Sequence, residues 1–340
     1  MKRRVLAICG GIGGAKLAFG LSKILPPEEL AFLVNTGDDF TYLNLNVSPD
    51  LDTVMYTLAE VNDPKRGWGI KNETWENLKV LKKYGVDTWF QLGDKDLATH
   101  IRRTQLLGEG KKLSEVTKLL CTSLSVKHLI IPMSESPVST VVTTDKGKLA
   151  FQEYFVKFQC KPKVKKISYI GSNKAEIPKV LKKLIDENKF SGVIICPSNP
   201  YLSIDPILSI PELNLFLSER SIPVLTVSPI INNASVKGPT SKIMKEMNIE
   251  PSVKSIADHY LGLTDILMVD KKDKENIPLL DSISFVFDSI YMKTSNQKIN
   301  LATIYRPLNN FFINPFMEHV RRKYVCKNQI KKGKSGTKDM

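Results

Sequence analysis

The chain has 340 residues, of which 42% are hydrophobic and 25% charged, and its formal net charge is +14 at pH 7. This composition is typical of a globular protein, and the length allows one large α/β domain with a smaller addition. No apolar run approaches the roughly 20 residues that a membrane-spanning helix needs, so we expect no membrane partner.

The positive charge raises the question of nucleic-acid binding. Much of the excess lies in paired lysines and in the C-terminal stretch 321–338, without interleaved aromatic residues. We therefore expect a basic surface for small anionic ligands and no nucleic-acid partner. The five cysteines form no CxxC or Cys/His cluster, and the short basic N-terminus runs into glycines instead of a signal-peptide core. Both features favour a cytoplasmic protein with reduced thiols.

A glycine-rich turn follows the first predicted strand, residues 5–9. Gly10, Gly11, Gly13 and Gly14 precede a helix that we expect to open at residue 15. Glycines allow close approach of a bulky anion, and the free N–H groups of a helix N-terminus suit a phosphate. The pattern is no Walker loop and fits the dinucleotide fingerprint only loosely. It predicts a phosphate cradle, and the alternative is a tight turn that binds nothing.

Strands and helices then alternate along the chain. Strands are predicted at residues 5–9, 31–34, 89–92, 128–131, 167–170, 192–196, 224–227, 266–269 and 283–287, with a β-hairpin formed by 138–144 and 149–155 and a polar excursion at 159–166. Helices are predicted at 49–59, 73–83, 94–107, 113–124 and 178–188. This alternation predicts an α/β fold with a mostly parallel sheet and helices on both faces.

We expect one domain over residues 1–300, with the hairpin excursion near 138–166 as a smaller added region. The pattern ends near residue 301, so 301–340 is a C-terminal extension whose last part we expect to be disordered. Ligands of parallel sheets collect beyond the carboxyl ends of the strands. The residues at these ends are Gly10 to Gly14, Asp38, Asp39, Ser134, Ser198, Asn199 and Ser228.

Four carboxylates lie within fifteen residues: Asp38 and Asp39 after a strand, and Asp50 and Asp52 in the first turn of a helix that Ser48 caps. Acidic residues stabilise helix N-termini, so Asp50 and Asp52 can be purely structural. Beside a phosphate cradle, however, such oxygens can hold Mg²⁺ and bridge it to a diphosphate.

A second polar group opens the helix at 94–107. His100 follows Asp96 by four residues, and Arg102 and Arg103 come next. A solvated charged face and a helix-stabilising pair are the simple interpretations. Trp68, Trp75 and Trp89 are core or pocket-wall residues, one of which could stack on a flat ring.

Nine blocks occur in a fixed order, and together they carry a resemblance. They are CGGIGGAKLAFGL, VNTGDDF, SPDLDTVMYTLA, GWGIKNET, WFQLGDKDLATHIRRT, IPMSESPVST, FQEYFV, CPSNPYLSIDPILSI and SPIINNASVKGP. The chain resembles the 2-phospho-L-lactate transferase family (CofD/FbiA) over about residues 5–287.

The resemblance implies a Rossmann-like core and transfer of a 2-phospholactyl or phosphoenolpyruvyl group from a guanosine diphosphate-linked donor. The acceptor is the deazaflavin Fo, GMP is released, and the product is the first phosphorylated precursor of coenzyme F420. It further implies Mg²⁺ as cofactor and a homodimer.

The resemblance also implies roles for residues. The cofactor-binding set is Gly10, Gly11, Gly13, Gly14, Gln91, Asp94, Lys95, Ser198, Asn199, Ser228, Lys237 and Gly238. The catalytic residues are Asp50 and Asp52, and the metal ligands are Asp38, Asp39 and Asp50. The chain departs from the family pattern at Gln91, at Glu135 and at the pair Asn232 and Asn233, where relatives often carry a basic residue, Asp and a glycine.

Phosphoryl-type transfer depends on positioning and charge neutralisation. Our hypothesis is that the ribityl hydroxyl of Fo attacks the distal phosphorus in line, with Asp50 by preference accepting the proton. One rival is a non-catalytic nucleotide or nucleotide-sugar sensor of the same fold. Another is an NAD(P)-dependent oxidoreductase, although the glycine spacing differs from that of the dinucleotide-binding fingerprint.

Overall fold

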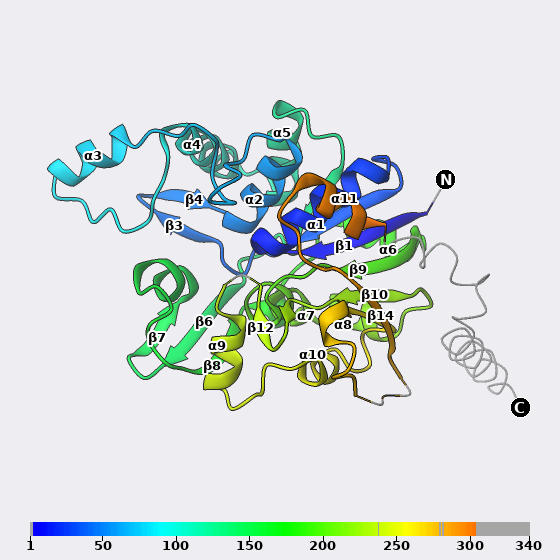
Figure 1. Cartoon of the computed structure of the whole chain (residues 1–340). Helices are drawn as coiled ribbons and strands as arrows, with labels where there is room; N and C mark the ends of the chain where they lie inside the picture. The colour runs from blue at the N-terminus through cyan, green and yellow to red at the C-terminus, as the bar shows by residue number, and fades with distance from the viewer. Residues whose placement is uncertain (1–2, 237, 279, 281, 304–340) are drawn as a thin grey trace, which may run out of the picture.

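The computed structural model describes residues 3–236, 238–278, 280 and 282–303. Its centre is a seven-stranded sheet in which every neighbouring pair is parallel (Figure 1). The strands are β1 (Arg4–Cys9), β2 (Leu30–Val34), β5 (Leu129–Pro132), β9 (Phe190–Ile195), β10 (Val224–Val227), β13 (Ile266–Asp270) and β14 (Ser284–Asp288). The predicted α/β class with a mostly parallel sheet is confirmed.

The strand order reverses between β1 and β9, and this switch point lies between the loops that follow these two strands. The order is β14-β13-β10-β9-β1-β2-β5, so the chain builds outward from β1 to one edge and then returns to β9 beside β1. In open parallel sheets a crevice forms where the order reverses, outside the carboxyl ends. The loops after β1 and β9 therefore lie side by side.

Helices cover both faces of the sheet. In β1, Val5, Ala7 and Cys9 pack into one core cluster, whereas Leu6 and Ile8 pack into the other. The first cluster includes residues of α1 (Gly11–Ile24), α2 (Pro49–Leu58), α4 (Asp94–Gly108), α5 (Leu113–Ser123) and α11 (Ser295–Ala302). The second includes α6 (Lys179–Asp186), α7 (Asp205–Leu208), α8 (Pro211–Ser218), α9 (Thr240–Glu246) and α10 (Val253–His259). This alternation follows from the two-residue period of a strand.

A smaller region lies beside the core. It contains an antiparallel sheet of β6 (Ser139–Thr144), β7 (Gly147–Ala150) and β8 (Val164–Ile170), and a hairpin of β3 (Phe40–Tyr42) and β4 (Leu45–Val47). Helix α3 (Glu76–Lys83) buries none of its residues, and in Figure 1 it projects away from the sheet. Short elements complete the fold: β11 (Ile230–Ile231), β12 (Ala234–Ser235), and the helical turns η1 (Glu153–Lys157), η2 (Ser172–Lys174), η3 (Pro200–Ile204) and η4 (Lys271–Asp273).

Three local predictions are wrong in this region. The second hairpin strand ends at Ala150, and the predicted continuation to 155 is helical. The excursion at 159–166 and the strand at 167–170 merge, because β8 begins at Val164 and pairs with β6 instead of joining the parallel sheet. The predicted strand at 89–92 is an irregular segment, since Trp89 and Phe90 pack against Phe40 and Tyr42 and not into a ladder.

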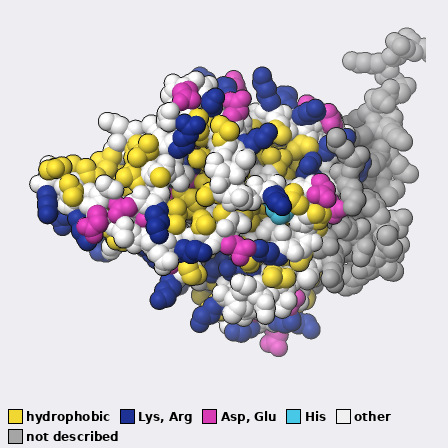
Figure 2. Space-filling model, turned by 90° about the horizontal axis from the view of Figure 1, so that it is seen from above, with side chains coloured by type: hydrophobic (Ala, Val, Ile, Leu, Met, Phe, Trp, Pro, Cys, Tyr) yellow, Lys and Arg dark blue, Asp and Glu magenta, His cyan; other side chains and the backbone are white. Residues whose placement is uncertain are grey.

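Helix α11 runs across the predicted boundary at residue 300. It packs along α1, where Gly20 comes so close to the carbonyl of Lys298 that a Cβ would lie 2.1 Å from it. The predicted extension from residue 304 onward lies outside the described residues. Within the described part no helix is long and apolar enough to cross a membrane. Figure 2 shows one face on which Lys and Arg side chains are scattered among hydrophobic ones.

Candidate functional site

A cavity of about 480 Å³ opens at the switch point of the sheet. Its walls come from the segments after β1, β2, β9 and β10, from the N-termini of α1 and α2, and from α4. Predicted site residues that line it are Gly10, Gly11, Gly13, Asp38, Asp50, Asp52, Gln91, Ser198, Asn199, Ser228 and Gly238. The carboxyl ends of the strands thus bring residues from four distant segments to one place.

The glycine-rich turn is shorter than predicted. Only Gly10 stands between β1 and α1, because the helix begins at Gly11 and not at residue 15. A Cβ on Gly13 would lie 2.3 Å from the carbonyl oxygen of Pro197, and one on Gly14 would lie 2.5 Å from Ser198 Oγ. These glycines therefore allow α1 to pack against the loop after β9. The N-terminus of α1 still faces the cavity, as a phosphate cradle requires.

Asp50 lies at the N-terminus of α1, although it belongs to α2. The backbone N–H of Gly11 donates to its Oδ1 at 2.6 Å, and Asn35 Nδ2 donates to its Oδ2 at 2.9 Å. Burial raises the pKa of Asp50 to about 6, against the lowering effect of these two hydrogen bonds. A carboxylate with such a pKa, in a cavity, can accept a proton near neutral pH.

Asp38 is held beside Asp50 by two amides. Asn35 Nδ2 donates to Asp38 Oδ1 at 3.2 Å, and Gln152 Nε2 donates to Oδ2 at 3.2 Å. Burial, followed by the charges of Asp50 and Asp39, raises the pKa of Asp38 well above its usual value. Among the described residues no Lys or Arg forms an ion pair with Asp38 or Asp50. Two buried carboxylates in this state attract a cation.

Asp39 lines a second cavity of about 620 Å³ that shares Asp38 with the first. Ser48 Oγ donates to its Oδ2 at 2.7 Å, whereas its buried Oδ1 finds no partner in the described structure. Burial raises the pKa of Asp39 well above its usual value, despite the lowering effects of Ser48 and Arg103. The three predicted metal ligands thus span the boundary between two cavities.

Asp52 faces the opposite side of α2 from Asp50. Both of its oxygens accept hydrogen bonds from Arg103, one of them from Nη1 at 3.0 Å. This pair is almost fully buried. The opposite charges and the hydrogen bonds between them compensate the cost of removing both groups from water. Asp52 borders the first cavity, but its carboxylate is engaged by the protein itself.

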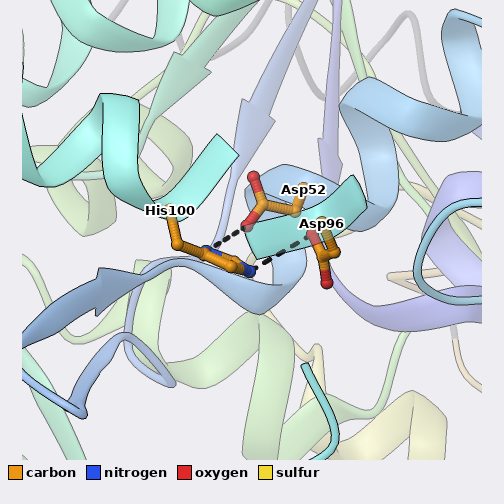
Figure 3. Close-up of side chains that lie close together, drawn as sticks. All are labelled: Asp52, Asp96 and His100. Atoms are coloured by element: carbon orange, nitrogen blue, oxygen red, sulfur yellow. Dashed lines mark ion pairs between the residues drawn. The ribbon is translucent and has the colours of Figure 1, made fainter. Parts of the chain in front are cut away.

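His100 lies between two carboxylates, as Figure 3 shows. Its Nδ1 is 3.7 Å from Asp52 Oδ2, and its Nε2 is 3.2 Å from Asp96 Oδ1. These groups lie close enough together to suggest a metal site. Each ring nitrogen, however, faces a different polar group of the protein: Asp96 for Nε2 and, at 3.2 Å, Arg103 Nη1 for Nδ1. We therefore interpret His100 as linking Asp96 to Asp52 through Arg103, which lies between His100 Nδ1 and the Asp52 carboxylate.

Tyr56 also binds Asp96, donating to its Oδ1 at 2.7 Å. Burial opposes ionisation of Asp96, but the hydrogen bonds of His100 and Tyr56 outweigh it and lower its pKa. Asp96 and His100 both border the first cavity. The simple interpretation of Arg103 as part of a solvated face is wrong, because its side chain is buried.

Asp94 and Lys95 hold a loop and do not line either cavity described above. Asp94 accepts from Thr74 Oγ1 at 2.6 Å and from the N–H groups that open α3, and the Thr74 bond in particular lowers its pKa to about 2. Lys95 Nζ donates to the carbonyl of Asn72 at 2.6 Å. Both residues therefore fix the segment before α3.

The loop after β9 joins the glycine turn through one serine. Ser198 Oγ donates to the carbonyl of Gly10 at 2.8 Å and accepts from its N–H at 3.1 Å. Asn199 Oδ1 caps η3, and its Nδ2 is buried without a partner in the described structure, which leaves a donor for a ligand. Lys237 lies outside the described residues.

Aromatic side chains form another part of the cavity wall: Trp68, Trp89, Phe90, Phe151 and Phe155. Of the three tryptophans, Trp75 does not line the cavity. The guanidinium of Arg66 lies over Trp68 and Trp75, 5.0 and 5.1 Å from the ring centroids. Such a wall suits a flat ring system.

Two residues of the site were missed in the sequence. Asn35 follows β2 directly, so its place at a strand end was the available signal. Gln152 comes from the small antiparallel region, and no local pattern indicates that it reaches Asp38.

A family model for 2-phospho-L-lactate transferase CofD matches residues 5–290. The chain belongs to the CofD family. A 2-phospho-L-lactate transferase of Methanosarcina mazei is 38% identical over 271 residues, covering 79% of this chain and 88% of the relative. A phosphoenolpyruvate transferase of Streptomyces griseus is 39% identical over 277 residues, with 79% and 86% covered. The CofD family thus includes relatives named for two different three-carbon groups, and the chain is a transferase of this family.

A solved structure shares the fold of this CofD family member. A protein of the UPF0052 family from Bacillus halodurans aligns with a TM-score of 0.58 at 14% identity, covering 89% of this chain and 99% of the other. At this identity the likeness supports the arrangement of the elements and nothing about activity.

Proposed function

We propose that the protein transfers a 2-phospholactyl or phosphoenolpyruvyl group from a guanosine diphosphate-linked donor to the deazaflavin Fo. The products are GMP and coenzyme F420-0 or its dehydro form. The observation that carries the proposal is the buried Asp50 carboxylate, which accepts the N–H of Gly11 at the helix N-terminus of a cavity with aromatic walls. The family membership supports the class of transferred group.

Asp38, Asp39 and Asp50 are the residues that would hold Mg²⁺. They offer carboxylate oxygens, burial raises the pKa of each, and Asp39 Oδ1 has no partner in the described structure. Their oxygens do not all lie within 4.8 Å of one another, so Asp39 would have to approach Asp38 and Asp50 for all three to hold one ion. When bound, the ion would neutralise the charge of the donor diphosphate.

The protein's own residues position the reactants and move one proton. The terminal ribityl hydroxyl of Fo attacks the phosphorus that carries the three-carbon acid, and Asp50 accepts the hydroxyl proton. A new P–O bond forms, the bond to the bridging oxygen breaks, and GMP leaves with that electron pair. Because the N–H of Gly11 is donated to Asp50, the later N–H groups of the first turn of α1 and the unpartnered Nδ2 of Asn199 would contact the phosphates. Asp52 anchors Arg103 in this scheme.

The test is direct incubation with Fo, Mg²⁺ and a freshly prepared guanosine diphosphate-linked donor, followed by mass spectrometry. We expect a deazaflavin product that is heavier by a phospholactyl or phosphoenolpyruvyl group, and its mass identifies the donor. Tight binding of a guanosine nucleotide without any product would support the rival, a nucleotide-binding regulator of the same fold.

We further propose that the enzyme is a cytoplasmic homodimer. Large apolar side chains stand exposed on α3, on α4 and just after α3: Val80 at 43%, Ile101 at 51% and Tyr84 at 78%. A self-association surface would cover them. Sedimentation of the purified protein at micromolar concentration would contradict the proposal if it gave the mass of a single chain.

A further inference from the structure

Asp96 carries an oxygen that the protein leaves free. Tyr56 and His100 both face Oδ1, whereas no contact with Oδ2 is found among the described residues. The side chain is 12% exposed and borders the first cavity. An ionised carboxylate only accepts hydrogen bonds. This oxygen therefore suits a ligand group that donates one.

A chain of contacts fixes the direction of that carboxylate. Arg103 Nη1 lies 3.2 Å from His100 Nδ1, and a guanidinium only donates hydrogen bonds. Nδ1 must therefore accept, which leaves the ring proton on Nε2, the nitrogen that faces Asp96. Arg103 is itself held by both oxygens of Asp52. The series Asp52, Arg103, His100 and Asp96 thus has one consistent set of donors and acceptors.

The position of Asp96 relative to Asp50 indicates what the ligand is. Tyr56, which binds Asp96, follows Asp50 by six residues on α2, or about 9 Å along the helix axis. Both carboxylates border the same cavity. A molecule whose reacting hydroxyl meets Asp50 can therefore extend a second donor toward Asp96.

We propose that Asp96 binds a second hydroxyl of the acceptor's polyol chain, and that His100 is a positioning residue which keeps Asp96 in place. This inference rests on the proposed function, because that function supplies the chain of hydroxyls. It assigns acceptor recognition to the first turn of α4, where Asp96 meets Tyr56 of α2.

The experiment measures binding separately from turnover. Fo and analogues that each lack one secondary hydroxyl of the ribityl chain are titrated into the wild-type protein and into Asp96→Asn, with GDP as a second ligand. We expect one analogue to bind the wild type about tenfold more weakly than Fo, as is typical of a lost hydrogen bond to a charged group. Asp96→Asn should bind Fo about as weakly as the wild type binds that analogue, without discriminating between the two. Its affinity for GDP should not change.

Variants of His100 separate positioning from a general loss of structure. His100→Asn keeps an acceptor near Nδ1 but removes the donor at Nε2, whereas the longer amide of His100→Gln can return a donor to that place. We expect His100→Asn to raise the KM for Fo while kcat changes little, and His100→Gln to restore part of the affinity. Asp258→Asn, a change of an exposed carboxylate on α10, serves as the matched control.

Two outcomes would overturn the inference. Equal binding of Fo and every deoxy analogue to the wild type would mean that Asp96 receives no chain hydroxyl. Equal weakening of Fo and GDP by Asp96→Asn would mean that the residue only maintains the fold. If the wild type neither binds nor converts Fo, the proposed function itself fails. If it converts Fo but binds Fo and every deoxy analogue equally, the proposed function holds and this inference alone fails.

Discussion

Two aspartates on one turn of α2 have opposite surroundings. Asp50 and Asp52 are both almost fully buried, at 7% and 5% exposed. Asp52 is neutralised by a bidentate contact with Arg103, whereas among the described residues Asp50 accepts from a backbone N–H and an amide. Burial of an ionised group is costly unless it is paired. The charge of Asp52 is therefore compensated within the protein. The charge of Asp50 is not compensated by the described residues, so a bound cation or a proton can compensate it.

This difference separates two tasks that the sequence motif alone does not distinguish. The side with Arg103 holds α2 against α4, and it can be judged by the stability of the folded protein. The side with Asp50, Asp38 and Asn35 opens to the cavity, and it can be judged by chemistry. Substitutions on the Asp50 side should accordingly lower kcat, whereas substitutions on the Arg103 side should lower stability and weaken acceptor binding.

The largest effect is expected for Asp50→Asn. Loss of the proton acceptor should lower kcat by about 10²- to 10⁴-fold. The fold should persist, since a neutral amide is cheaper to bury than an unpaired carboxylate. Steady-state rates with Fo, together with Mg²⁺ titration and thermal unfolding, check this. A variant that turned over at nearly the wild-type rate would remove Asp50 from the mechanism.

On the other side, Arg103→Met should lower stability and, because Arg103 contacts His100, should also raise the KM for Fo. It leaves Asp52 buried without its cation, which typically lowers the free energy of unfolding by about 3–5 kcal/mol. The double variant Asp52→Asn with Arg103→Met removes both charges and should recover much of that loss. Urea unfolding of the wild type, the two single variants and the double variant measures it. Additive effects in the double variant would contradict a direct coupling.

The comparison also explains what could be predicted from the sequence. The parallel sheet, the glycine turn and the clustering of Asp38 with Asp50 follow from strand periodicity and from the rule for carboxyl ends. The division between Asp50 and Asp52 does not, because Arg103 is 51 residues away and reaches Asp52 only through the packing of α4. A local sequence pattern cannot predict contacts between residues so far apart in the chain.

The wrong local predictions have the same origin. Residues 89–92 have the apolar pattern of a strand, but Trp89 and Phe90 find aromatic partners in β3 and form a wall instead. Tertiary packing outweighed propensity there. Gln152 was unpredictable for a related reason, since it approaches Asp38 across 114 residues of sequence.

The pH dependence of stability should include a contribution from Asp50 that Asp50→Asn removes. Its pKa is 3.8 in an unfolded chain and about 6 in the folded protein, so the native state binds the extra proton. The resulting stability is complete below pH 4 and is lost as the pH rises through 6, at most about 3 kcal/mol by linkage. In the absence of Mg²⁺, the free energy of unfolding of the wild type should therefore fall across this range more steeply than that of Asp50→Asn. Parallel curves for the two proteins would contradict the elevated pKa.

The smallest expected difference is between two Gly-to-Ala variants, one beside Asp50 and one on α4, the helix that carries Arg103. In Gly10→Ala the backbone is already extended, but the new Cβ would lie 2.4 Å from Asp50 Oδ2 and 2.9 Å from Ser203 Cβ. Such overpacking typically costs about 1–3 kcal/mol, and here it must also displace the carboxylate, so kcat should fall with stability.

Gly108→Ala is the matched change at the end of α4, the helix that carries Arg103. A Cβ there meets nothing within 4 Å. Because alanine loses less backbone entropy on folding, we expect a gain of about 0.5–1 kcal/mol and an unchanged kcat. Urea unfolding and steady-state rates of both variants test the pair. If Gly10→Ala lost stability but kept its rate, the carboxylate of Asp50 would have to work from a displaced position, and its contact with the N–H of Gly11 would be irrelevant to the chemistry.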